Sequence, residues 1–340
     1  MLESNLTVRR GTRCLGEIMN HRDKSETCAS APVLSAVIPC YNEADGLDEL
    51  LKRVSASVSQ CALPSEILLV DDGSTDGTWQ KMLELQKEYS NLCLVKLNRN
   101  HGHQLALSAG LAICHASEYV MVLDADLQDP PELLSEMLEL MTAEDADVVY
   151  GQRKLREGES WFKLITAKWF YKILRFLTDL DIPPDTGDFR LMKRHVVDTL
   201  NDMPEHSRFI RGMVSWVGGK QLPLLYNREA RYAGKTKYPL GKMVRLAADA
   251  ITSFSIAPLK IGLRIGALGL VIGAGIFIYC LYSYFFRETA LGWTSIVATI
   301  VVMGSIQIFL LGLIGEYLAR IFIESQHRPL FLIDKIINPK

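Results

Sequence analysis

Several signals that mark common protein classes are missing from this sequence. Seven cysteines are scattered through 340 residues, and none of them forms a Cys-x-x-Cys pair. An odd number of scattered cysteines is typical of free thiols in a reducing compartment, which disfavours a disulfide framework or a zinc site. Excess positive charge is also lacking, because the formal net charge is -2. A protein that is basic overall and binds nucleic acid is therefore disfavoured.

Two further motifs are absent. Residues 1–31 contain no apolar stretch of the kind found in secretory signal peptides, and their mixed charges predict a flexible leader. No Gly-x-Gly-x-x-Gly sequence occurs anywhere, which disfavours a dehydrogenase that binds a dinucleotide.

Long uncharged runs, by contrast, lie near the C-terminus. Residues 265–286 and 289–315 contain no charged side chain, and each run could cross a hydrocarbon core of about 30 Å as a helix. Only two charged residues separate the runs, which predicts a hairpin of two transmembrane helices over 261–320. Basic residues flank both ends of the hairpin, so the positive-inside rule places the N-terminal region and a tail over 321–340 in the cytosol.

Strand and helix patterns alternate over residues 32–239. Five apolar segments read as buried strands, and segments with helical spacing of apolar residues separate them. These strands are predicted at 33–40, 66–74, 92–98, 119–125 and 146–153. Continuously apolar strands that alternate with helices predict an α/β fold, with a mainly parallel sheet covered by helices on both faces.

Polar residues follow each of the five predicted strands. They are Tyr41, Asn42 and Glu43, then Asp71 and Asp72, then Asn98 to Asn100, then Asp124 and Asp126, and finally Arg153. Ligands of parallel sheets bind beyond the carboxyl ends of the strands, where these residues would meet. The sequence therefore predicts a ligand site at this edge.

Asp124 and Asp126 form an acidic pair one residue apart. Such carboxylates repel each other unless a cation lies between them, and hard oxygen ligands suit Mg²⁺ or Mn²⁺. An acidic cluster at a helix N-terminus is the alternative for the nearby Asp129 and Glu132. A metal site that includes a histidine from the segment 101–103 also stays open.

Several motifs in order resemble the family-2 glycosyltransferases of GT-A fold. They are "LSAVIPCYNEADGL", "ILLVDDGSTDGT", "LNRNHGHQLALSAGL" and "MVLDADLQDPPE", and "DAD" matches the metal-binding Asp-x-Asp motif of that family. The segments "TGDFRLM" and "RYAGKTKY", followed by two membrane spans, narrow the resemblance to the polyprenyl-phosphate glycosyltransferases. Bactoprenol (undecaprenyl-phosphate) glucosyltransferases look most similar, with dolichyl-phosphate mannosyltransferases as relatives. The resemblance covers about residues 33–335.

This resemblance implies the residues of a nucleotide-sugar site. The nucleotide sugar would be bound by Pro39, Tyr41, Glu43, Val70, Asp72, Asp124, Ala125, Asp126, Arg153, Arg231 and Lys237. Asp72 would contact the base and Glu43 the ribose. The metal ligands would be Asp124, Asp126 and Gln128.

Basic and amphipathic segments predict the acceptor side. Residues 231–242 are rich in cations, and they read either as a lid that binds phosphates or as a solvated basic loop. In the first interpretation Arg231, Lys235 and Lys237 bind the lipid phosphate. Residues 160–179 and 240–260 have the composition of interfacial membrane helices, although a core helix stays open for the first segment.

The predicted catalytic residues are Asp126, Asp188, Arg231 and Lys237. Asp188 follows Gly187 and is expected to position other groups, with a general base or a helix cap as alternatives. A general base is less needed for a phosphate acceptor than for a sugar hydroxyl, because a phosphate monoester is largely dianionic at neutral pH.

The expected function is inverting transfer of a hexose to a polyprenyl phosphate, which gives a β-linked phosphosugar for cell-surface glycan modification. UDP-glucose and undecaprenyl phosphate are the leading substrates, and a mannosyltransferase that uses GDP-mannose is an alternative. A processive polysaccharide synthase is disfavoured because no Gln-x-x-Arg-Trp motif occurs. A membrane sensor or scaffold is the non-enzymatic alternative. We expect a homo-oligomer, a tetramer as in some relatives, in the inner membrane.

Overall fold

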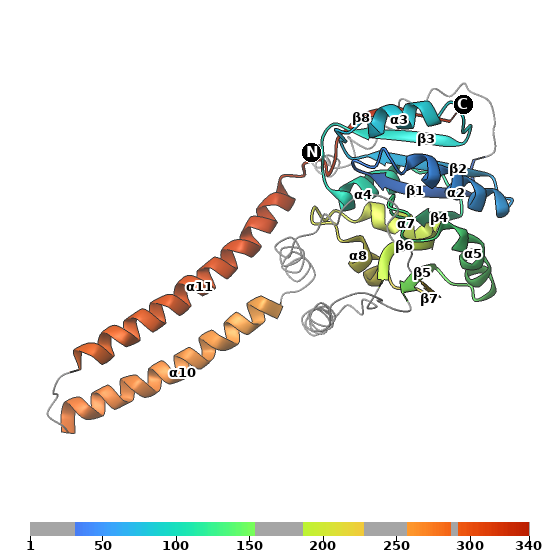
Figure 1. Cartoon of the computed structure of the whole chain (residues 1–340). Coiled ribbons are helices and arrows are strands. Elements are labelled where there is room, and N and C mark those ends of the chain that lie inside the picture. The colour runs from blue at the N-terminus through green and yellow to red at the C-terminus, as the bar shows by residue number, and fades with distance from the viewer. Residues whose placement is uncertain (1–30, 154–185, 228–256, 287–291, 340) are drawn as a thin grey trace, which may run out of the picture. The chain divides into compact units, whose positions relative to one another are not determined.

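A computed structural model describes residues 31–153, 186–227, 257–286 and 292–339 (Figure 1). These residues divide into two compact units, one built around a β-sheet and the other consisting of two long helices. The predicted leader up to residue 30, the amphipathic segment 160–179 and the basic segment 231–242 lie outside the described residues.

The first unit contains a mixed eight-stranded sheet with the order β7-β5-β6-β4-β1-β2-β3-β8. Its strands are β1 (Leu34–Cys40), β2 (Ser65–Asp71), β3 (Leu92–Leu97), β4 (Tyr119–Val122), β5 (Val148–Arg153), β6 (Thr186–Lys193), β7 (Gln221–Tyr226) and β8 (Ile333–Ile337). β1 is parallel to β2 and β4, and β2 is parallel to β3. β6 runs antiparallel between β4 and β5, and β8 runs antiparallel to β3. The five predicted strands correspond to β1 to β5.

Helices cover both faces of the sheet, as predicted. They are α2 (Leu47–Gln60), α3 (Thr78–Leu85), α4 (His103–Ile113), η1 (Pro131–Leu133), α5 (Leu134–Ala143), α7 (Arg194–Asp202) and α8 (Ile210–Val217). Alternate residues of a strand point to opposite faces. Ala36 and Ile38 of β1 share a core cluster with α2, α3 and α5. Val37, between them, lies against Gly110 of α4 on the other face.

The C-terminal segment contributes an edge strand that was not predicted. The expected tail over 321–340 contains the last turns of an α-helix, which ends at Ser325, and then β8. Gln86 Nε2 in the loop after α3 donates to the carbonyl oxygens of Ile337 (3.3 Å) and Asn338 (3.1 Å). β8 pairs with the backbone of β3, which would otherwise form an open edge of the sheet.

The second unit contains α10 (Ala257–Phe286) and α11 (Trp293–Ser325). Among the described residues, Ile306–Ser325 is apolar and long enough to cross a membrane, with a mean hydropathy of 1.8 and no buried residue. A Cβ atom added at Gly262 of α10 would lie 3.0 Å from Leu310 Cδ2 of α11. The missing side chain therefore lets the two helices approach each other within the hairpin.

Candidate active site

The loops that follow β1 and β2 are joined by hydrogen bonds. Asn42 N donates to Ser74 Oγ (3.0 Å), and the Asn42 side chain accepts a bond from Thr75 N (2.9 Å). Glu43 N donates to Thr78 Oγ1 (3.0 Å). Asn42 has a φ of 54°, a left-handed conformation that asparagine tolerates better than most residues. These bonds fix the backbone around two predicted donor-site residues, Tyr41 and Glu43.

The predicted nucleotide-site residues on β1 and β2, and in the loop after β1, differ in the exposure of their side chains. Pro39 and Val70 are partners in the register of β1 and β2, and both are buried, so they can only form the floor of a site. Tyr41, by contrast, is 37% exposed. Glu43, two residues later, is half-buried. Tyr41 and Glu43 are therefore the members of this group with side chains accessible to a ligand.

Asp72 holds the loop that follows β3. Its two carboxylate oxygens accept bonds from the backbone nitrogens of His101 (2.7 Å) and Gly102 (2.9 Å). The side chain is buried, and burial raises its pKa despite these two bonds. The base contact expected for Asp72 stays a prediction, whereas the structure gives this carboxylate a role in shaping the start of α4.

A mixed strand order brings Asp124 and Asp188 together. β6 is antiparallel to β4, with Val122 opposite Arg190. The residues just after β4 therefore lie beside the first residues of β6, at the edge where β1 to β3 also end. The segment "TGDFRLM" forms β6, so its Asp188 lies on a buried strand and is not a helix cap.

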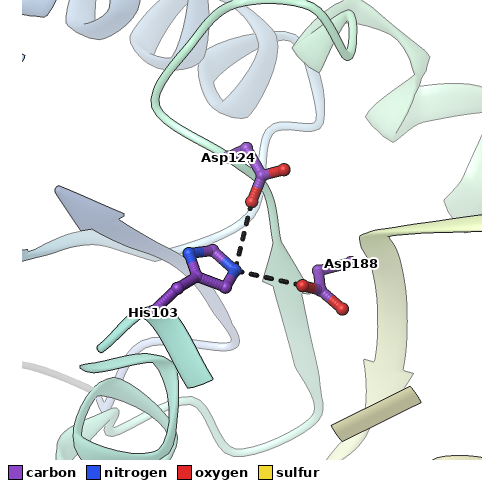
Figure 2. Close-up of side chains that lie close together, drawn as sticks. All are labelled: His103, Asp124 and Asp188. Atoms are coloured by element: carbon purple, nitrogen blue, oxygen red, sulfur yellow. Dashed lines mark hydrogen bonds and ion pairs between the residues drawn. The ribbon is translucent and has the colours of Figure 1, made fainter. Parts of the chain in front are cut away.

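Asp124, Asp188 and His103 form a compact cluster, the acidic group (Figure 2). His103 is the first residue of α4, and its Nε2 atom lies 3.0 Å from Asp188 Oδ2 and 3.4 Å from Asp124 Oδ1. One ligand atom from each residue lies within 4.8 Å of the others, close enough to hold a metal ion. Asp126 and Gln128, which were predicted as ligands with Asp124, are not part of this group. Asp126 Oδ1 instead accepts a bond from Gln128 N (3.2 Å).

Burial and neighbouring charges separate the proton affinities of the three groups. Burial raises the pKa of Asp124 to about 6, although His103 opposes this shift. Burial opposes a charged His103, but the bond to Asp188 and the two carboxylate charges raise its pKa to about 9. Burial would also raise the pKa of Asp188, but Arg211 and His103 hold it well below its usual range. Asp188 is therefore ionised at neutral pH.

The loop between Asp124 and α5 is constrained at Leu127. This residue has a φ of 57° and a buried side chain, and leucine rarely adopts such a left-handed conformation. Strained residues of this kind persist where the surrounding structure fixes them, often next to functional groups. The packing of Leu127 thus holds the acidic loop in one conformation.

Arg153 of β5 and Asp129 pair next to Gly187 of β6. Asp129 is fully buried and accepts a hydrogen bond from the Tyr226 hydroxyl, and Arg153 Nη2 lies 3.9 Å from Asp129 Oδ1. Gly187 of β6 leaves room for this pair, because a Cβ atom there would lie 3.1 Å from Arg153 Nη2. Asp129 therefore contacts an arginine and a tyrosine, and η1 begins only at Pro131.

Sequence reasoning missed several residues that surround Asp188. Gln104 and Arg211 both bond to its carboxylate, and neither was singled out. His103 was considered only as an alternative metal ligand. The pair "HQ" at the start of a predicted helix was the available signal, whereas nothing in "RFIRG" indicates that Arg211 reaches β6. Arg231, Lys235 and Lys237 lie outside the described residues.

Comparison with known proteins assigns the chain to a family. The family model for glycosyl transferase family 2 matches residues 35–200, which include all of β1 except Leu34, β2 to β6, and the acidic group. Bacillus subtilis glycosyltransferase YkcC is 42% identical over 308 residues, covering 88% of this chain and 93% of its own length. The chain belongs to glycosyl transferase family 2. The GT-A-like α/β fold and the glycosyltransferase class expected from the sequence are thereby confirmed.

Other similarities of this family-2 glycosyltransferase extend through the helical hairpin. The model of the GtrB C-terminal hairpin matches residues 257–321, which span α10 and most of α11. The Escherichia coli prophage bactoprenol glucosyl transferase homolog is 36% identical over 308 residues, covering 89% of this chain and 99% of its own length. Bactoprenol glucosyl transferase of Shigella phage SfV is 36% identical over 305 residues, covering 88% and 97%. A solved structure, glucosyl-3-phosphoglycerate synthase of Mycobacterium tuberculosis, aligns with a TM-score of 0.45 and 17% identity over 66% of this chain and 78% of that one.

Proposed function

We propose that this family-2 glycosyltransferase transfers glucose from UDP-glucose to a polyprenyl phosphate, with inversion at the anomeric carbon. The observation that carries the proposal is similarity to bactoprenol glucosyl transferases over nearly the whole of both chains, hairpin included. The acidic group at the carboxyl edge of the sheet supports it, because carboxylates can hold a divalent cation, and such a cation would neutralise the diphosphate that leaves when a nucleotide sugar reacts.

The residues present fit a divalent cation, Mg²⁺ or Mn²⁺. Among the described side chains, Asp124 Oδ1 is a buried oxygen without a hydrogen-bond donor, and it has only His103 Nε2 at 3.4 Å. Carboxylate ligands suit both Mg²⁺ and Mn²⁺. When bound, the metal would stabilise the negative charge of the departing diphosphate. Asp124 would be a ligand together with the predicted Asp126 and Gln128, or together with Asp188 and His103, in which case metal binding would displace the proton from the His103 ring, because only a neutral imidazole binds a metal.

In this proposal Asp188 positions His103 and does not act as a general base. Its carboxylate is ionised and already bonded to cations, so it is a weak base. The phosphate acceptor needs no strong base, because its second pKa is near 6 and it is largely dianionic at neutral pH. The lipid phosphate oxygen would attack the anomeric carbon directly, and Asp188 would keep His103 beside Asp124.

The remaining site residues keep the roles predicted from the sequence. Tyr41 and Glu43 would bind the nucleoside, and Arg153 the diphosphate. Arg231, Lys235 and Lys237 would bind phosphates of the donor and of the lipid. We place the protein in the inner membrane through α10 and α11, with the sheet unit in the cytosol.

A panel assay tests the proposed function. The full-length protein in mild detergent is mixed with undecaprenyl phosphate, MnCl₂ and one radiolabelled donor at a time: UDP-glucose, GDP-mannose or UDP-N-acetylglucosamine. We expect a labelled lipid product from UDP-glucose only, and loss of that product with EDTA. A product from GDP-mannose instead would support the mannosyltransferase alternative. No lipid product from any donor would overturn the proposal.

A further inference from the structure

The Asp188 carboxylate is bonded from two helices that are distant in the sequence. Gln104 in the first turn of α4 donates from Nε2 to Asp188 Oδ2 (3.0 Å). Arg211 in the first turn of α8 donates from Nε to Asp188 Oδ1 (2.8 Å), and its Nη2 lies 3.4 Å from Oδ2. The third guanidinium nitrogen donates to the carbonyl oxygen of Thr186 (3.1 Å). Arg211 thus grips both the carboxylate and the backbone of β6.

Gln104 also joins the two helices to each other. Its Oε1 atom accepts a bond from Ile210 N at the start of α8 (2.8 Å). One amide side chain therefore connects α4, β6 and α8. The neighbouring residue, His103, lies on the same turn of α4 and bonds to the same oxygen of Asp188. The position of His103 next to Asp124 consequently depends on where Asp188 is held.

We propose that Gln104 and Arg211 are positioning residues for the transfer reaction, which hold Asp188, and through it His103, in register with Asp124. This inference rests on the proposed function for its kinetic consequence. The bidentate geometry of Arg211 supports it, because a planar guanidinium fixes the orientation of a carboxylate as well as its charge. The Asp188 side chain is only 2% exposed, so water cannot take over these bonds.

A matched control lies three residues before Arg211. Arg208 donates to the carbonyl oxygens of Leu200 (2.7 Å) and Met203 (2.6 Å), at the end of α7. These two bonds go to backbone carbonyl oxygens of the same region of the chain, whereas the bonds of Arg211 go to Asp188 and Thr186. A variant of Arg208 therefore tests whether the loss of arginine bonds in this region is by itself enough to lower kcat.

Three variants of the full-length protein test the inference: Gln104→Leu, Arg211→Lys and Arg211→Ala, with Arg208→Lys as the control. We measure kcat, the KM for UDP-glucose, the thermal midpoint, and Mn²⁺ affinity from the paramagnetic resonance signal of free Mn²⁺. We expect kcat to fall about 100-fold in Arg211→Ala, since small misplacements near reacting groups have costs of this size. Arg211→Lys should restore part of kcat, and the donor KM should change less than kcat. Arg208→Lys should leave kcat unchanged.

The Mn²⁺ measurement separates positioning from charge. Removal of a cation beside carboxylates would by itself strengthen Mn²⁺ binding. If Arg211 holds the geometry instead, Arg211→Ala should weaken Mn²⁺ binding, and the uncharged change Gln104→Leu should weaken it as well. Tighter binding in Arg211→Ala, or unchanged Mn²⁺ affinity and kcat in Gln104→Leu, would overturn the inference. If Arg211→Ala does not fold, Arg211→Lys and Gln104→Leu still decide.

The two proposals can fail separately. A wild-type protein without transfer activity would refute the proposed function, while the Mn²⁺ affinities would still test the positioning of the acidic group. A wild-type protein with full activity, together with variants that match Arg208→Lys in every measurement, would refute the positioning role and leave the proposed function standing.

Discussion

Asp124 illustrates how one buried oxygen can indicate a ligand. A carboxylate in an apolar environment is costly unless it is bonded or paired. Asp188 meets this requirement with Arg211, Gln104 and His103, whereas Asp124 Oδ1 accepts no hydrogen bond among the described residues and has only the His103 ring, which it shares with Asp188, at 3.4 Å. This contrast between two carboxylates of one group supports the proposal that Asp124 binds a cation.

Asp124→Asn should therefore abolish metal-dependent transfer. The change removes a charge that both candidate ligand sets share, and we expect at least a 100-fold loss of kcat. Asp145→Asn serves as the control, because Asp145 is an exposed carboxylate paired with Lys193 on the surface. Transfer assays and Mn²⁺ titration of both purified variants check the prediction. Retention of Mn²⁺ affinity by Asp124→Asn would contradict it.

Asp126→Asn distinguishes the two ligand sets. Asp126 follows Asp124 and Ala125 on the same loop, and a cation is predicted to relieve the repulsion between the Asp124 and Asp126 carboxylates. We expect Asp126→Asn to abolish transfer while the protein stays folded and bound to membranes. If this variant keeps near wild-type turnover and Mn²⁺ affinity, Asp126 is not a ligand, and the result favours the set His103, Asp124 and Asp188.

At the scale of elements, β1 to β5 could be predicted because each is a continuously apolar run followed by polar residues. β6 could not, because its buried side chains include Asp188 and Arg190, which look like loop residues until their partners are known. β7 and β8 are edge strands with weaker burial patterns. The gathering of polar strand ends at one edge of the sheet was predictable, whereas the contacts of Arg211 depend on the path of the chain in space.

The position of α4 on the sheet gives a prediction at this scale. A Cβ atom at Gly110 would lie 2.3 Å from Val37 Cγ1 and 3.1 Å from Val70 Cγ2. Gly110→Ala should push α4 from the sheet, with a loss of stability of about 1–3 kcal/mol, and should displace His103. Gly46→Ala is the control, because a Cβ atom added at Gly46 would have its nearest neighbour 3.9 Å away and the φ of Gly46 is -97°. Equal thermal midpoints and activities of the two variants would contradict the prediction.

Near the amino end of β2, away from the acidic group, Glu66 is a buried carboxylate whose contribution to stability depends on pH. Glu66 accepts bonds from Ser35 Oγ, from His115 N and, at 3.1 Å, from His115 Nδ1. Burial opposes the ionised form of Glu66, but these bonds outweigh it and lower its pKa. A lowered pKa contributes stability above the unfolded value, and this contribution is lost as the pH falls through the folded value.

Glu66→Gln should therefore flatten the acid limb of the stability curve. The thermal midpoint of the wild type should fall as the pH drops below about 4, where an unperturbed glutamate becomes protonated. The variant should be less stable than the wild type at pH 7 and should lose less on acidification. Parallel acid limbs in the two proteins, measured by thermal unfolding between pH 3 and pH 7, would assign the loss to other groups.

At the scale of the whole molecule, the hairpin has two kinds of glycine. Gly262 is covered by Leu310 and Leu313 of α11 in the same chain, whereas a Cβ atom at Gly269 would meet nothing within 4 Å. Small residues let membrane helices approach closely. Gly262 therefore serves packing within the hairpin, and Gly269 offers an open stretch of α10 that a second copy of the chain could occupy.

Gly269→Leu should consequently weaken assembly without disturbing the hairpin, and Gly262→Leu should disturb the hairpin itself. Leucine at 269 blocks close approach of another helix, while leucine at 262 would overlap the side chains of Leu310 and Leu313. Crosslinking in mild detergent should give a homo-oligomer for the wild type, a smaller oligomeric fraction for Gly269→Leu, and lower thermal stability for Gly262→Leu. A wild-type protein that stays monomeric at native expression levels would refute assembly. An oligomer that is unchanged in Gly269→Leu would move the interface away from this face of α10.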